Sequence, residues 1–183
     1  AFDQDRSLLH QASPGLFWVA VLLCTLLAVQ RSFAVESSDG AGDALRMSGL
    51  DPAGIFLGKV GAVAAELVGL ELVLGGGVVV LFGTDVRGVA ILVTSSLAAT
   101  AGLAAAGVLY GVISAGLRVR ETLLPLLFLP VAAPVLLGAT EAWRSGLGLS
   151  ADDGWRWLVI LAAFAAVYLA IGVLAFGSLL EES

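Results

Sequence analysis

Two acidic residues, Glu66 and Glu71, are the side chains best placed to do chemistry in this 183-residue sequence, because both fall inside a long apolar stretch. An ionisable group within a membrane-crossing segment is costly, so it usually faces a cavity, a partner helix or a transport path. A separation of five residues is about 140° around an α-helix. We therefore expect two different environments, with Glu71 near mid-bilayer as a buried neutral or hydrogen-bonded acid, or as a group that acts in gating or coupling.

The sequence has one histidine, His10, and one cysteine, Cys24. His10 precedes the first apolar stretch, where it could ligate a haem iron, although a lone interfacial histidine with no such role is the plainer interpretation. A zinc site or a Ser-His-Asp triad needs further ligands or partners. One cysteine also supports no disulfide framework. The sequence therefore predicts no metal site, no catalytic residues and no directly bound cofactor.

Two short segments resemble enzyme motifs but fail in detail. The first, Gly54-Ile-Phe-Leu-Gly-Lys-Val60, is one residue shorter than a phosphate-binding loop and has valine where a metal-binding Ser or Thr belongs. The second, Asp39-Gly40 followed by Asp43, lacks the spacing of lipid-head-group transferases. We therefore predict that the chain is not an enzyme, and that any ATP it uses is hydrolysed by a separate subunit.

Five apolar stretches must position these residues, at about 14–33, 54–82, 88–117, 123–141 and 155–180. The chain is 59% hydrophobic and 13% charged, with a mean hydropathy of +1.01, whereas a soluble domain is about a quarter charged. Each stretch approaches or exceeds the roughly 20 residues that cross a bilayer as a helix. The prediction is an all-α polytopic transmembrane bundle, one domain over residues 1–183, with five crossings in the lipid bilayer. A net charge of −6 offers no basic face for nucleic acid.

The connections and helix surfaces carry further signals. Residues 31–53 form a long polar loop, within which a short helix is predicted at 43–50. Lysine and arginine divide almost evenly between the two sides, so they leave the orientation open. The tryptophans Trp18, Trp143, Trp155 and Trp157 fall on the side opposite the long loop, as an aromatic belt would.

Small residues and prolines mark particular helices. Four-residue spacing relates Gly61, Ala65 and Gly69 in the second stretch, and Ala98 with Gly102 and Gly107 with Gly111 in the third. Such stripes permit close helix approach, either inside the subunit or at a subunit interface. In the fourth stretch Pro125, Pro130 and Pro134 each remove a helical hydrogen bond, which predicts a kinked or broken helix.

Several segments, taken in order, resemble a known family. They are Pro14-Gly-Leu-Phe-Trp-Val-Ala20, Gln30-Arg-Ser-Phe-Ala34, Leu50-Asp-Pro-Ala-Gly-Ile-Phe-Leu-Gly-Lys59, and an arginine pair followed by the proline series, from Gly116 to Leu136. The pattern covers essentially the whole chain and resembles the CcmB-type permeases of cytochrome c maturation. The resemblance implies an ABC-2-like fold with six crossings and both termini in the cytoplasm, so that this chain lacks the first helix. It also implies that residues 31–53 are cytoplasmic.

The resemblance further implies the partners and the location. We expect a bacterial inner-membrane permease subunit for haem export and haem chaperone release, driven by a separate ABC ATPase and assembled with a haem-handling membrane partner and a haem chaperone. Haem would be the transported or partner-bound species, and a homodimer is one open arrangement. We expect Asp43, Leu45, Arg46, Met47 and Leu50 to couple the chain to the ATPase. A generic lipid or drug exporter permease and a non-transporting scaffold stay as alternatives.

Overall fold

Five helices and no strand make up the part of the chain that the computed structural model describes, which is residues 2–38, 49–82, 87–115 and 120–182. The helices are α1 (Phe2–Ser38), α3 (Pro52–Phe82), α4 (Val89–Ala115), α5 (Arg120–Gly146) and α6 (Gly154–Glu182). Each holds a segment long and apolar enough to cross a membrane. The predicted all-α transmembrane bundle is confirmed.

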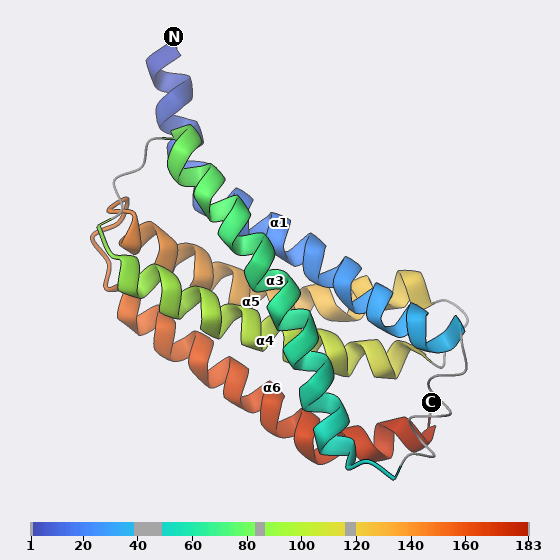
Figure 1. The fold of residues 1–183 in the computed structure, drawn as a ribbon. Helices are drawn as coiled ribbons and strands as arrows, with labels where there is room; N and C mark the ends of the chain where they lie inside the picture. The colour runs from blue at the N-terminus through green and yellow to red at the C-terminus, as the bar shows by residue number, and fades with distance from the viewer. Residues whose placement is uncertain (1, 39–48, 83–86, 116–119, 183) are drawn as a thin grey trace.

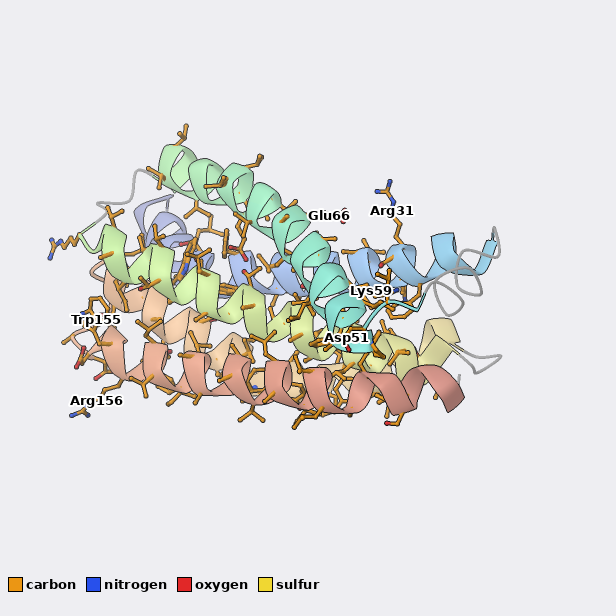
Figure 2. The ribbon with its side chains drawn as sticks, turned by 60° about the horizontal axis from the view of Figure 1, so that its bottom comes forward. Arg31, Asp51, Lys59, Glu66, Trp155 and Arg156 are labelled. Carbon is orange, nitrogen blue, oxygen red and sulfur yellow. The ribbon has the colours of Figure 1, made fainter. Side chains whose placement is uncertain are left out.

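The helices alternate in direction along the bundle. α1, α4 and α6 run one way, and α3 and α5 run the other way (Figure 1). Figure 2 shows Trp155 and Arg156 at one end, here called the tryptophan end, and Lys59 and Asp51 toward the other, here called the lysine end. α4 is central, because it packs against every other described helix. α3 crosses the bundle obliquely, from the lysine end to the tryptophan end (Figure 1).

The first helix is longer than predicted. α1 continues to Ser38, so residues 31–38, which were expected in the polar loop, are helical. Near this end of α1 the ring of Phe33 is buried over Gly111 of α4, with no room for a side chain at that glycine. The expected coupling residues Asp43, Leu45, Arg46 and Met47 lie outside the described residues. Leu50 is described and is 59% exposed.

The proline-rich helix is continuous. α5 runs unbroken from Arg120 to Gly146 with Pro125, Pro130 and Pro134 inside it, so the three prolines do not break it. Its end lies beyond the predicted one and is a Schellman motif. Gly148 has a φ of 69° and donates its N–H to Ser145, and Leu149 donates to Arg144. Only glycine adopts this left-handed conformation readily, which fixes where α5 stops.

The two stripes of small residues differ in role. On α4, Gly102 receives the ring of Phe164 from α6, and Gly107 and Gly111 receive Val29 and Phe33 from α1. That stripe packs the subunit internally. On α3, Gly61, Ala65 and Gly69 are exposed, and within the described residues nothing lies within 4 Å of a Cβ built on either glycine. The α3 stripe therefore faces away from the bundle.

Candidate functional site

A buried carboxyl group, that of Glu71, lies in the seam between α3 and α4. Among the described residues it is the buried acid. Glu71 is only 8% exposed, and the hydroxyl of Thr100 on α4 donates a hydrogen bond to its Oε1. An isolated charge buried in lipid would be far more costly than this hydrogen-bonded carboxyl. Glu71 therefore joins α3 to the central helix. This is the arrangement of a buried, hydrogen-bonded acid, one of the two interpretations that the sequence left open. The sequence offered no signal for Thr100, because its position opposite Glu71 depends on helix packing.

A cavity of about 220 Å³ opens beside Glu71, between α3 and α4. It is lined by Val68, Glu71, Leu72, Gly75, Gly76, Leu92, Val93, Ser96, Leu97 and Trp143. The indole Nε1 of Trp143 donates to the hydroxyl of Ser96 at 3.0 Å, which fixes the ring as one wall. The cavity is therefore mostly apolar, with one carboxyl at its side and a fixed aromatic wall.

Trp143, one wall of this cavity, belongs to an aromatic cluster. Trp143 stacks on Phe17 with ring centroids 3.9 Å apart, and Trp18 meets both rings edge-on. Trp18 and Trp143 are 0% and 7% exposed, so the prediction that they form an interfacial belt is wrong. They are core residues that hold α1 to α5. Trp155, at 53% exposed, does fit the belt.

Glu66 lies in different surroundings from Glu71, as the 140° separation implied. Glu66 is exposed, and together with Arg31 of α1 it borders a hollow of about 200 Å³. Figure 2 shows Arg31 pointing away from the bundle. An exposed acid within a spanning segment is unfavourable in lipid, so this α1–α3 face is suited to contact with another subunit.

Lys59 is a buried cation that sequence reasoning did not single out as functional. Lys59 lies in a spanning helix and is only 8% exposed. Its ammonium sits 4.2 Å from the centroid of the Phe33 ring. A cation over an aromatic face is stabilised by the ring quadrupole. The contact ties α3 to α1 at the lysine end. A lysine seven residues into an apolar helix was the available signal.

The other predicted site residues are dispersed. His10 is part of α1, but its side chain lies outside those described, so haem ligation by it stays a prediction. No group of three or more His, Cys, Asp or Glu residues that could hold a metal ion occurs within the described residues. The polar side chains of the described residues join helices through single contacts, and among them neither a nucleophile with a base nor a ligand shell is assembled.

Comparison with known proteins points to one family. The family model described as "CcmB protein" matches residues 1–183. "Heme exporter protein B" of Paracoccus denitrificans is 36% identical over 176 residues, covering 94% of this chain and 78% of that protein. The Pseudomonas aeruginosa protein of the same name is 34% identical over 168 residues, covering 90% of this chain and 74% of that protein. The protein of that name in Haemophilus influenzae is 31% identical over 180 residues, covering 98% and 80%.

Proposed function

This chain belongs to the CcmB protein family, and we propose that it is the membrane-spanning permease subunit of a haem exporter in cytochrome c maturation. The observation that carries this function is the likeness to relatives named "Heme exporter protein B" across at least 90% of the chain. The five helices able to cross a membrane agree with it. The chain works as a multi-pass protein, placed by this proposal in the bacterial inner membrane.

ATP hydrolysis is assigned to a partner subunit. The segment 54–60, which resembles a phosphate-binding loop, lies inside the helix α3. A phosphate-binding loop places its backbone N–H groups in an open turn before a helix, and backbone N–H groups within a helix are already bonded. This supports a separate ATPase as the source of the driving energy.

α3 is the proposed route by which motion passes through the subunit. Its lysine end begins at Pro52, two residues after Leu50. Gly49 and Leu50, the described residues of the predicted coupling segment 43–50, are not helical, so the short helix predicted there does not reach residue 50. Further along, Lys59 holds α3 to α1, and Glu71 holds it to α4. The helix also borders the cavity at the tryptophan end. A displacement at Leu50 would therefore reach both seams of α3.

The haem itself is assigned to the partners of this subunit. The cavity beside Glu71, about 220 Å³, is smaller than the roughly 300–1,000 Å³ that pockets for drug-sized ligands occupy. Haem is at least of that size, so this cavity does not suit it. A haem-handling membrane partner and a haem chaperone would carry the molecule, while this subunit transmits the motion. The exposed α1–α3 face suits the docking of such a partner or of a second copy.

Complementation tests this function. A Pseudomonas aeruginosa strain that lacks its own haem exporter protein B would receive the gene encoding this chain, and haem-stained c-type cytochromes would be measured. We expect cytochrome assembly to return. The double variant Met47→Asp, Leu50→Asp should reach the membrane normally, yet lose both co-purification of the ATPase and cytochrome assembly. Normal assembly and ATPase yield in that variant would exclude segment 43–50 as the coupling element.

A further inference from the structure

A cavity of about 620 Å³ lies at the lysine end, between α1 and the beginning of α3. Its lining residues are Ser32, Leu50, Asp51, Gly54, Ile55, Gly58, Lys59 and Ala62. The volume falls within the range of pockets that bury drug-sized ligands. The cavity is separate from the one beside Glu71, and it shares Leu50 and Lys59 with the proposed coupling route along α3.

Two charged residues, Asp51 and Lys59, are among the described lining residues of this cavity, and they stand in a fixed order along the chain. Asp51 is exposed and precedes the helix, and its Oδ1 accepts the N–H of Ala53 at 3.4 Å, so the carboxylate is held as the helix cap. Lys59 lies eight residues further along, about 12 Å at 1.5 Å per residue. Because a side chain on a helix leans toward the N-terminus, the ammonium lies closer to Asp51 than the backbone does.

In this order Lys59 can bind an anion deeper in the membrane, and Asp51 can bind a cation at the membrane surface. Lys59 is within the spanning segment Pro52–Val80, and Asp51 lies just outside it. The ring of Phe33 keeps the ammonium at the cavity wall. Ser32 adds a hydroxyl, Ile55 adds apolar surface between the two charged residues, and Ala62 adds apolar surface beyond Lys59 on the membrane side. A ligand that fits needs an anion next to its apolar part and a cation at its far end.

The geometry points to an aminophospholipid site, in which the phosphate of a phosphatidylethanolamine headgroup meets Lys59 and its primary ammonium meets Asp51. In that lipid the phosphate lies next to the acyl chains and the ammonium lies farther out, which is the order of the two protein charges. Charge-assisted hydrogen bonds on both groups give the selectivity. A phosphatidylglycerol headgroup would leave Asp51 unmatched, and a phosphatidylcholine ammonium has no N–H to donate. Basic pockets between transmembrane helices are known to bind the headgroups of anionic lipids.

Lipid binding to the purified, delipidated protein tests this site. Phosphatidylethanolamine, phosphatidylglycerol and phosphatidylcholine with identical acyl chains would be added singly, and bound lipid counted by native mass spectrometry. We expect phosphatidylethanolamine to bind roughly tenfold more tightly than the other two, since each of them loses one charge-assisted bond. Equal binding of all three lipids, or a preference for phosphatidylglycerol, would overturn the assignment.

Variants assign the two charges separately. Asp51→Asn keeps the helix cap, because Asn caps as well as Asp. It should lower the affinity for phosphatidylethanolamine to that for phosphatidylcholine. Lys59→Gln should weaken the binding of all three lipids roughly tenfold, and Lys59→Arg should retain it. Arg156→Gln, at the tryptophan end (Figure 2), is the matched control and should change nothing. If Asp51→Asn leaves the lipid preference intact, the site is not the one described.

Soluble headgroups separate a lipid site from a phosphate site. O-phosphoethanolamine and inorganic phosphate carry the charges without acyl chains, so neither should displace the lipid at equal concentration. Displacement by either compound at that concentration would show that the membrane side of the cavity contributes nothing, and would contradict a lipid ligand. This site does not depend on the haem-exporting role, so a failure of one leaves the other standing.

Discussion

Glu71 carries the main polar contact across the α3–α4 seam, because its buried carboxyl accepts the hydroxyl hydrogen of Thr100. Glu71→Gln keeps an acceptor of the same shape and should leave the thermal unfolding of the purified protein nearly unchanged. Glu71→Leu removes the acceptor and should cost about 1 kcal/mol, the usual size of one interhelical hydrogen bond in a membrane protein.

Thr100→Val is the control for the Glu71 variants. If the contact is real, Glu71→Leu combined with Thr100→Val should cost less than the sum of the two single changes, since both remove the same bond. Additive losses would mean that the two side chains do not interact. Normal folding of both Glu71 variants with failed cytochrome c assembly would show that the carboxylate itself is required for function.

At the scale of helices, Gly111 decides how closely α1 approaches α4. A Cβ at this position would lie 2.3 Å from the Phe33 ring and 2.9 Å from Val29. Gly111→Ala should therefore push α1 away and destabilise the protein by about 1–3 kcal/mol, the usual cost of overpacking, less the gain in helix propensity. Unfolding in detergent, followed by circular dichroism, measures the difference.

Gly69→Ala is the matched control for Gly111→Ala, since it replaces a mid-helix glycine with alanine on the outward face of α3. Within the described part of the chain, nothing lies within 4 Å of a Cβ built there. The change should be neutral or stabilising by up to about 1 kcal/mol, from helix propensity alone. Two variants of equal stability would refute the close α1–α4 contact.

The helices could be predicted from sequence because their length and apolarity are local properties. Their detailed bounds could not, since α1 continues past residue 33 to Ser38, beyond the predicted apolar stretch, and its end packs against Gly111 on another helix through Phe33. The same holds for the candidate site. The spacing of Glu66 and Glu71 predicted two environments, but it gave neither the Thr100 partner nor the 8% exposure of Lys59, which depend on how the helices pack.

At the scale of the whole molecule, the proposed orientation places the tryptophan end on the extracytoplasmic side of the membrane. With Cys24 replaced by Ala, a cysteine introduced at Ser150 should react with an impermeant thiol reagent added to intact cells, and one introduced at Leu50 should not. Both positions lie between helices, at opposite ends of the bundle. Opening the cells should make the Leu50→Cys protein react. Labelling of Leu50→Cys alone in intact cells would mean that the orientation is inverted.

Haem delivery across a sealed membrane tests the central assignment most directly. Vesicles with the cytoplasmic face inside, prepared from cells with and without this chain, would enclose ATP and haem and carry the ATPase, the haem-handling partner and the haem chaperone. The measured quantity is haem bound to the chaperone on the outer face. We expect it to rise with ATP only when the chain is present, and to fall to background with Met47→Asp, Leu50→Asp. Equal ATP-dependent loading in vesicles without the chain would contradict its assignment as the haem exporter's permease subunit.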